Sequence, residues 1–141
     1  MWNMIWPIAV VVLANTVYNI CAKSTPGGIN SFAALFLTYM TAAAASLALF
    51  FVTAEQKNLV VELSKANWAS WVLGAAIIGL EFGYIAIYRA GWKVSAGSLV
   101  ANISLACVLL VVGALLYHEH ISVRQMIGVA ICALGLYFVG K

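Results

Sequence analysis

The residue with the clearest chemical potential is Glu81, a single carboxylate inside the apolar stretch that runs from Trp68 to Tyr88. An ionised side chain at this depth in hydrocarbon costs roughly 2.5 to 3.5 kcal/mol on insertion scales. Such residues normally face the interior of a helix bundle or a watery cavity and serve a function. Because burial disfavours the charged form of a carboxyl, Glu81 is a candidate for exchanging a proton against a cationic substrate.

Other polar side chains recur at spacings of three and four residues, which places them on common helix faces. Asn15, Tyr18 and Asn19 form one such group, Tyr84 and Tyr88 follow Glu81, and Ser98 precedes Asn102. We predict that these groups line a polar cavity. The candidate substrate-binding residues are Glu81, Tyr84, Tyr88, Asn15, Tyr18, Asn19, Ser98 and Asn102. The alternative is structural: the asparagines would be hydrogen-bonding links between helices, and Glu81 a protonated carboxyl held by a neighbouring helix.

The sequence contains no pattern typical of an enzyme. It has no nucleophile–base pair, phosphate-binding loop or paired carboxylates. Three cysteines lie in separate apolar segments, which predicts neither a disulfide framework nor a metal site. The run His118-Glu119-His120 supplies too few ligands for a metal. We therefore expect no enzymatic activity, no catalytic residues, no cofactor and no metal.

The composition explains where these residues must lie. The 141 residues are 65% hydrophobic and only 8% charged, and the mean hydropathy is +1.05. Soluble domains are about 25% charged, and several apolar runs approach the ~20 residues needed to cross a bilayer. The net charge of +3 is scattered, which excludes a nucleic-acid-binding surface. Most of the chain is therefore expected to face lipid or other helices.

The apolar stretches predict an all-α polytopic membrane protein with five transmembrane helices. The expected spans are 4–22, 31–53, 68–88, 96–117 and 123–140. Residues 54–67 between the second and third spans read as a short interfacial helix or a solvated loop. Ser122 and Gln125 predict a capping box at the start of the fifth span.

The positive residues give almost no preference for one orientation in the membrane. The side that carries the N-terminus has Lys57, Lys65 and Arg124, and the opposite side has Lys23, Arg89, Lys93 and Lys141. Three against four is too small a difference for the positive-inside rule to decide. Either the chain inserts both ways and pairs head to tail, or local details fix one orientation.

Small residues spaced four apart predict close helix contacts. Gly79 and Gly83 flank Glu81, while Gly97 with Ala101 and Gly128 with Cys132 repeat the spacing in the last two spans. Small residues let helix backbones approach closely in lipid. The contact partner is either another helix of the same chain or a second copy. Because five spans do not easily enclose a substrate pathway, we expect a homodimer, with a dual-topology inverted pair as one form.

The second half of the chain resembles the EamA-type module of the drug/metabolite transporter superfamily. In that module the fourth helix ends in a Gly-Glu pair, followed by a Ser or Thr, a Gln and two spaced glycines. The matching positions here are Glu119, Ser122, Gln125, Gly128 and Gly135. His118 stands in place of the usual glycine. The resemblance covers roughly 82–141 by motif, and the first half by helix count and polarity.

The resemblance implies a secondary transporter of a small metabolite or cationic compound, working as a pair of modules in a prokaryotic inner membrane. Related small exporters couple transport to protons through a carboxylate on their first helix. Here the first helix has no carboxylate and Glu81 lies on the third, so that mechanism does not transfer by position. Two other functions stay open: a non-transporting assembly or accessory subunit, and a subunit of a lipid-linked-sugar flippase.

Overall fold

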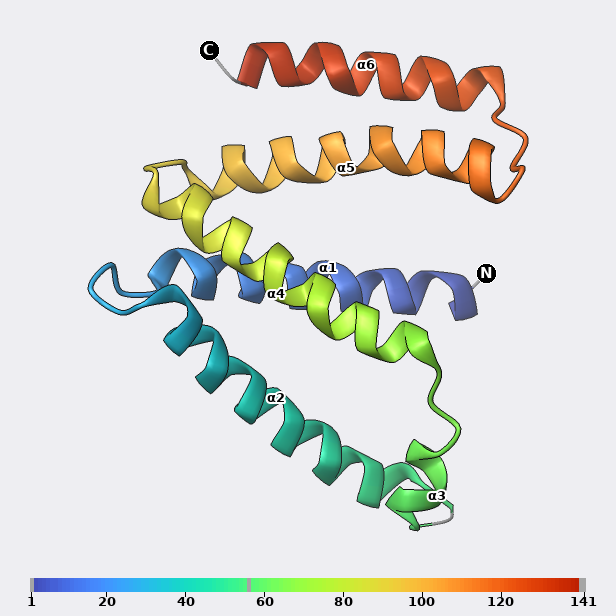
Figure 1. Cartoon of the computed structure of the whole chain (residues 1–141). Helices are drawn as coiled ribbons and strands as arrows, with labels where there is room; N and C mark the ends of the chain where they lie inside the picture. The colour runs from blue at the N-terminus through green and yellow to red at the C-terminus, as the bar shows by residue number, and fades with distance from the viewer. Residues whose placement is uncertain (1, 56, 140–141) are drawn as a thin grey trace. The chain divides into compact units, whose positions relative to one another are not determined.

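The computed structural model describes residues 2–55 and 57–139, and these are almost entirely helical (Figure 1). Four long helices are present, together with the one-turn helix α3 and the shorter C-terminal helix α6. Their bounds are α1 Trp2–Ser24, α2 Ser31–Thr53, α3 Leu59–Leu63, α4 Trp68–Arg89, α5 Val94–Leu116 and α6 Val123–Val139. The all-α prediction is confirmed, and each long helix begins and ends within about two residues of the predicted span.

Four of these helices have the length and composition to cross a membrane, namely Ile5–Ser24 within α1, and α2, α4 and α5. The three complete ones have 22 or 23 residues, which corresponds to roughly 33 to 35 Å of helix. This matches a hydrocarbon core of about 30 Å. The fifth predicted span is α6, whose 17 residues make it the shorter apolar helix. Gly140, its predicted last residue, lies outside the described residues.

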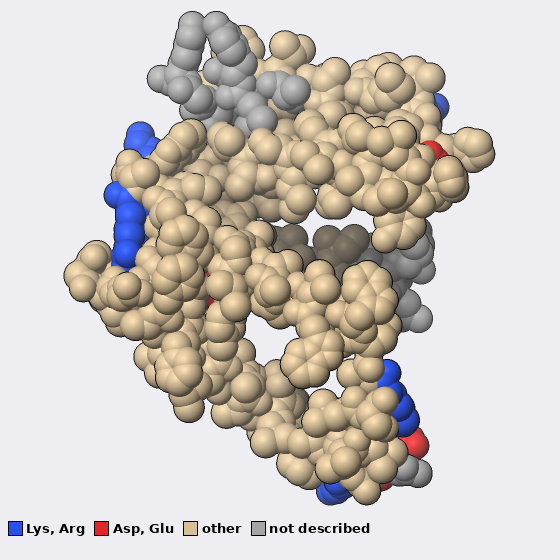
Figure 2. Space-filling view, in the orientation of Figure 1, with Lys and Arg blue, Asp and Glu red and all other residues tan. Residues whose placement is uncertain are grey.

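Apolar side chains cover the outside of the helices. Val52 is 81% exposed and Trp71 82% exposed, and most other large apolar residues are also on the surface. Figure 2 shows a face that is almost uncharged, with Lys and Arg at its margins. In water such a surface would be strongly unfavourable. In a bilayer it is the surface that contacts lipid, so the chain is an integral, multi-pass membrane protein.

Side-chain caps fix several helix ends. The Asn30 Oδ1 atom accepts hydrogen bonds from the backbone N–H groups of Phe32 and Ala33 at the start of α2. At the start of α6, the Ser122 N–H donates to Gln125 Oε1 at 2.8 Å, and the Gln125 N–H donates to Ser122 Oγ at 3.3 Å. This confirms the predicted capping box. Between α2 and α4, residues Leu59–Leu63 form the helix α3, so the helical alternative for that loop is correct.

The turn between α5 and α6 is tight although it lacks the glycine of the family pattern. His118 adopts a left-handed backbone conformation, with φ of 52°. The carbonyl of Gly113 accepts hydrogen bonds from the N–H groups of Tyr117 at 3.2 Å and Glu119 at 3.0 Å. The left-handed conformation is unfavourable for a residue with a side chain by roughly 1 to 2 kcal/mol. The turn therefore keeps its geometry at His118 at an energetic cost.

The helices fall into two compact units, which we describe separately. Unit 1 covers Met1–Arg89 and unit 2 covers Ala90–Lys141. In unit 1, α4 packs against both α1 and α2, and in unit 2, α5 packs against α6 as an antiparallel pair (Figure 1). The few buried apolar side chains of unit 1, such as Leu35 and Ile85, lie where α2 and α4 meet. The polar residues described next join α1 to the same helix α4.

Candidate functional site

A hydrogen-bond network joins α1 to α4 in the interior of unit 1. The Asn19 amide donates to the backbone carbonyl of Asn15 at 2.8 Å and to its Oδ1 atom at 2.7 Å. The Tyr88 hydroxyl of α4 donates to Asn19 Oδ1. Asn19 and Tyr88 are each only 4% exposed. Asn15 and Asn19 therefore share one face of α1, as their spacing predicts. Asn19 also links α1 to α4, which is the structural role considered for the asparagines as the alternative to substrate binding.

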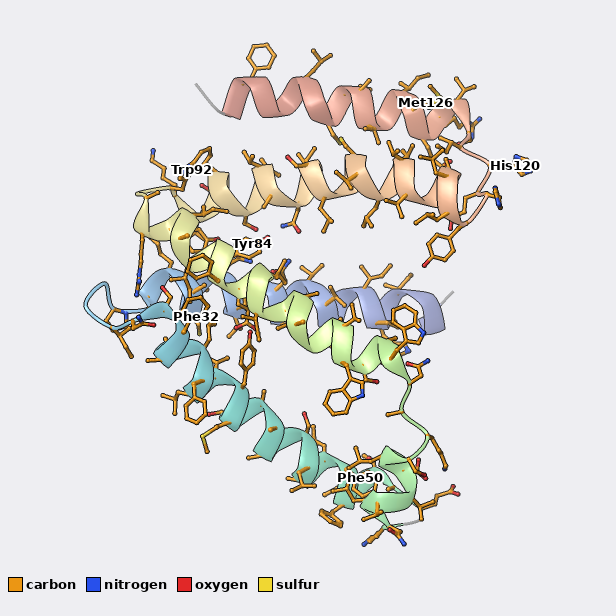
Figure 3. All side chains as sticks on the ribbon, viewed as in Figure 1. Phe32, Phe50, Tyr84, Trp92, His120 and Met126 are labelled. Carbon is orange, nitrogen blue, oxygen red and sulfur yellow. The ribbon has the colours of Figure 1, made fainter. Side chains whose placement is uncertain are left out.

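Aromatic rings continue the network along α4. The Tyr18 and Tyr84 rings meet edge to face with centroids 5.4 Å apart, and the Tyr84 and Tyr88 centroids are 6.1 Å apart. Edge-to-face packing is a favoured arrangement for two aromatic rings. Tyr84, labelled on α4 in Figure 3, is only 8% exposed. The predicted α1 and α4 faces thus meet through three tyrosines.

Glu81 lies one turn before Tyr84 and lines a small cavity where α1, α2 and α4 meet. The cavity encloses about 90 Å³. Its polar lining residues are Tyr18, Cys21, Thr25, Thr38 and Glu81. We call it the Glu81 cavity.

Two tyrosine hydroxyls near Glu81 are unsatisfied. The Tyr18 and Tyr39 hydroxyl oxygens are buried and have no hydrogen-bond partner among the described residues. Tyr18 lines the Glu81 cavity, and Tyr39 follows the lining residue Thr38 on α2. A buried hydroxyl without a partner normally costs about 1 to 3 kcal/mol. These two groups are therefore available to a ligand or to water at this place.

Two basic side chains close the same end of unit 1. The Lys23 ammonium donates to the backbone carbonyl of Tyr88 at 3.2 Å and lies 5.8 Å from the centre of the Tyr88 ring. The Arg89 guanidinium donates to Ser31 Oγ at 2.7 Å and to the carbonyls of Pro26 and Ile29 at 3.0 and 2.7 Å. Lys23 thus caps the C-terminal end of α4, where a positive charge is favourable. Arg89 fastens the loop that joins α1 to α2.

Ser98 and Asn102 lie in unit 2, on α5. The Asn102 amide donates to the Ser98 carbonyl at 2.8 Å and to Ser98 Oγ at 3.2 Å, so the predicted shared face is present. Asn102 also lines a cleft of about 660 Å³ between α5 and α6. The lining of this α5–α6 cleft is mainly apolar and includes the polar residues Asn102, Glu119, His120 and Gln125.

Glu119, beside the α5–α6 cleft, folds back onto α5. A Cβ atom built on the buried Gly113 would lie 2.6 Å from Glu119 Oε2, so the absence of a side chain at Gly113 makes room for this carboxylate. Figure 3 shows the neighbouring His120 pointing away from both helices of the pair. The described residues contain no cluster of His, Cys, Asp or Glu fit for a metal.

The structure gathers six of the eight predicted site residues into one cluster and shows others that the sequence did not. Asn15, Tyr18 and Asn19 of α1 meet the α4 residues through the contacts above. Sequence reasoning missed Tyr39, Thr25 and Thr38, which come from α2 and the end of α1. Tyr39 was detectable as a polar side chain inside the apolar 31–53 span, but only the packing of α2 on α4 shows that it lies near Glu81.

Comparison with known proteins identifies the family of this chain. The family model of the EamA-like transporter family matches residues 2–141. No curated protein and no solved structure gives a match. The family match extends the resemblance from the motifs of the second half to the first half, and it fits four apolar helices of membrane-spanning length followed by a shorter one. The chain therefore belongs to the EamA-like transporter family of the drug/metabolite transporter superfamily, whose members are membrane transporters of small compounds.

Proposed function

We propose that this protein is a secondary transporter of a small metabolite or cationic compound, coupled to protons through Glu81, in a prokaryotic inner membrane. The observation that carries the proposal is the placement of Glu81. It is a carboxyl within a membrane-spanning helix, and it lines the cavity at the junction of three helices. Intramembrane carboxyls in such positions serve as ion and proton sites in transporters.

Competition at a single carboxyl explains how coupling works in this proposal. When Glu81 is ionised, it attracts a cation into the site, and when it is protonated, that attraction is lost. Proton and cationic substrate therefore exclude each other, and substrate binds more weakly at low pH. The aromatic rings of Tyr18 and Tyr84 next to Glu81 offer a surface on which an organic cation is stabilised.

The proposal includes a homodimer with the substrate pathway between subunits. The small residues support it: a Cβ atom added at Gly79, Gly83, Gly128 or Gly135 meets no atom within 4 Å among the described residues. These positions therefore leave room for a helix of a second copy. A pair in opposite orientations follows from the balanced positive charges, because transporters commonly place their site between inverted repeats.

The decisive experiment replaces Glu81 by glutamine, which keeps the shape of the side chain and removes its titration. Purified protein in liposomes with an imposed proton gradient is offered methylammonium and tetraethylammonium as probe cations, and internal pH is followed with a dye. We expect the parent to exchange protons for at least one probe and Glu81→Gln to lose the pH dependence. Glu62→Gln is the matched control, because Glu62 lies on α3 and lines neither the Glu81 cavity nor the α5–α6 cleft. A folded Glu81→Gln protein with parent-like, pH-dependent transport would exclude the coupling role and move the search to Asn15, Tyr18, Asn19 and Asn102.

Orientation is tested by labelling single cysteines from each side of the membrane. We expect a given position to be labelled from both sides in the parent, and two lysines added to one side to make labelling strongly one-sided. Labelling of the parent from one side only would exclude the inverted pair.

One observation favours a lipid-linked substrate as the second candidate. The α5–α6 cleft is apolar and its volume of about 660 Å³ lies within the range of ligand pockets, about 300 to 1,000 Å³. A cleft between two helices accepts an acyl or isoprenoid chain. Transport that requires a lipid-linked sugar and is insensitive to Glu81→Gln would favour this flippase function.

A further inference from the structure

The Glu81 cavity of one subunit is too small to hold by itself the organic substrate, which the proposed pathway places between subunits next to this carboxyl. Sites that bury a drug-sized ligand occupy about 300 to 1,000 Å³, whereas this cavity encloses about 90 Å³. That volume is sufficient for a small ion with water, since one water needs roughly 10 to 15 Å³ by this kind of measure. A second occupant, distinct from the substrate, is therefore indicated.

The hydroxyl oxygens of the two threonines that line the cavity are set to accept rather than to donate. The Thr25 hydroxyl donates its hydrogen to the carbonyl of Cys21 at 3.2 Å, and the Thr38 hydroxyl donates to the carbonyl of Ala34 at 3.1 Å. A hydroxyl has one hydrogen, so both oxygens have only lone pairs left for an occupant of the cavity. The ionised Glu81 carboxylate is also an acceptor without hydrogens.

The counter-charge for an ionised Glu81 is missing from the cavity. Within residues 2–55 and 57–139, no Lys or Arg lines the cavity or forms an ion pair with Glu81. The titratable groups around it are Tyr18 and Cys21 from α1, Tyr39 from α2 and Tyr84 on α4 itself. None of these side chains becomes a cation, so an occupant of the cavity must supply the positive charge.

We propose that the Glu81 cavity is a binding site for a small monovalent cation of the Na⁺ type, coordinated by Glu81 with the hydroxyl oxygens of Thr25 and Thr38. The proposal rests on the transport function above and specifies a coupling ion that competes with the proton at Glu81. The Tyr18 hydroxyl lines the same cavity and has no partner among the described residues, so it is available to donate a hydrogen bond to the ionised carboxylate.

The charge balance favours a monovalent over a divalent cation. One carboxylate neutralises one positive charge. Ca²⁺ takes six to eight oxygen ligands, commonly from several carboxylates, and Mg²⁺ demands near-ideal octahedral geometry and retains water. A single carboxylate with two neutral hydroxyls fits neither requirement. Its one negative charge matches an alkali-metal ion, whose remaining ligands would be water.

The experiment measures cation binding without any transport. Full-length protein purified in detergent is titrated with NaCl, and with choline chloride at equal ionic strength, while the Tm is followed at alkaline and at mildly acidic pH. A ligand that binds only the folded state raises the stability of the protein as the ligand fills its site. We expect a saturable rise of the Tm with Na⁺ that choline does not produce, and a weaker apparent Na⁺ affinity in acid because protons occupy the carboxylate.

Matched threonine variants locate the site. Thr38→Val removes the hydroxyl but keeps the shape, and should lower the apparent Na⁺ affinity by roughly three- to tenfold, about the effect of one lost ligand. Thr41→Val is the control: its hydroxyl makes the same type of bond, to the Leu37 carbonyl at 3.0 Å on the same helix, and Thr41 does not line the cavity. Glu81→Gln should abolish the Na⁺ effect, and the threonine pair decides the question if that variant does not fold.

Three results would overturn the cation site: equal Tm curves for Na⁺ and choline, an unchanged Na⁺ response in Thr38→Val, or equal losses in Thr38→Val and Thr41→Val. Failure of this proposal is separable from failure of the transport function. If Na⁺ has no effect while transport depends on pH through Glu81, the coupling ion is the proton alone and the transporter proposal stands.

Discussion

Unit 1 and unit 2 are built from helices of similar hydropathy but are held together in different ways. In unit 1, polar side chains connect different helices, as in the bonds from Tyr88 to Asn19 and from Arg89 to Ser31, which join residues 69 and 58 positions apart. In unit 2, the described side-chain hydrogen bonds join residues three or four positions apart, as between Ser98 and Asn102. Among the described residues, no side-chain hydrogen bond joins α5 to α6, and the cleft between them is lined mainly by apolar residues.

The difference in side-chain hydrogen bonding suggests different roles for the two units. Polar bonds between helices in lipid fix a particular geometry, which a site around Glu81 requires. The described residues of α5 and α6 lack such bonds between helices, and their exposed small residues leave surfaces on which other helices can pack. We propose on this basis that unit 1 carries the Glu81 site and that unit 2 contributes a surface for assembly.

The largest effect should come from removing the guanidinium that fastens the loop of unit 1. Arg89→Ala deletes three hydrogen bonds to Ser31, Pro26 and Ile29. Charged hydrogen bonds contribute about 1.5 to 3 kcal/mol each when shielded, and with partial solvent exposure we expect a total loss of about 2 to 3 kcal/mol in SDS unfolding titrations. Arg124→Ala in unit 2 should change stability by less than about 0.5 kcal/mol. Equal losses of stability for Arg89→Ala and Arg124→Ala would contradict the view that side-chain hydrogen bonds hold unit 1 together more than unit 2.

The second effect concerns assembly through unit 2. Gly128→Leu should weaken homodimerisation about tenfold or more, because the leucine blocks the close approach of a second copy. A Cβ atom built at Gly128 meets no atom of the described residues within 4 Å, so folding should be preserved. Gly74→Leu on α4 is the control, since Gly74 is equally open. Analytical ultracentrifugation in detergent compares the two, and a stronger loss at Gly74 would place the dimer contact on unit 1.

A smaller effect is expected from the hydroxyl that links α1 and α4. Tyr88→Phe keeps the ring packing against Tyr84 but removes the donor to Asn19. Hydrogen bonds between membrane helices average about 0.6 kcal/mol and reach about 1.7, and the deep burial of both partners predicts a loss of about 1 kcal/mol. Tyr117→Phe at the exposed end of α5 should be neutral. A neutral Tyr88→Phe would show that ring packing alone holds unit 1.

The smallest effect should be a gain in unit 2. His118→Gly relieves the left-handed backbone, worth roughly 1 to 2 kcal/mol, and increases the freedom of the unfolded chain by roughly 0.5 to 1 kcal/mol. We expect a net stabilisation of about 0.5 to 1 kcal/mol in the same unfolding titration. His120 has no left-handed backbone to relieve, so His120→Gly should leave the stability unchanged or lower it slightly. Destabilisation by His118→Gly would indicate that the imidazole makes a contact that outweighs the strain.

The helices and their local faces were predictable because they depend on short-range rules. The bilayer sets the helix length, so apolar runs gave the bounds of α2 and α4 nearly to the residue. The helical period gave the Asn15–Asn19 and Ser98–Asn102 pairs, and the capping box gave the start of α6. Each of these features joins residues no more than four apart.

The composition of the Glu81 cavity was not predictable in the same way. It depends on which helices pack together, and the hydropathy of α1, α2 and α4 is too uniform to specify their partners. Tyr39 and Thr38 reach the Glu81 region only because α2 packs on α4. The Arg89 contacts have the same origin, since a basic residue at a helix end was interpreted only as a topology signal.

The hydrogen bonds from Arg89 to the loop between α1 and α2 have a consequence for biosynthesis. The carbonyl of Ile29 is made 60 residues before the guanidinium that binds it. While the ribosome adds these residues, α1 and α2 are already available for insertion, and the loop between them has no fastening. Once α4 emerges, unit 1 has all the groups that hold it, and unit 2 is still being translated. The N-terminal four helices should therefore mature as one insertion intermediate, before the C-terminal hairpin enters the membrane.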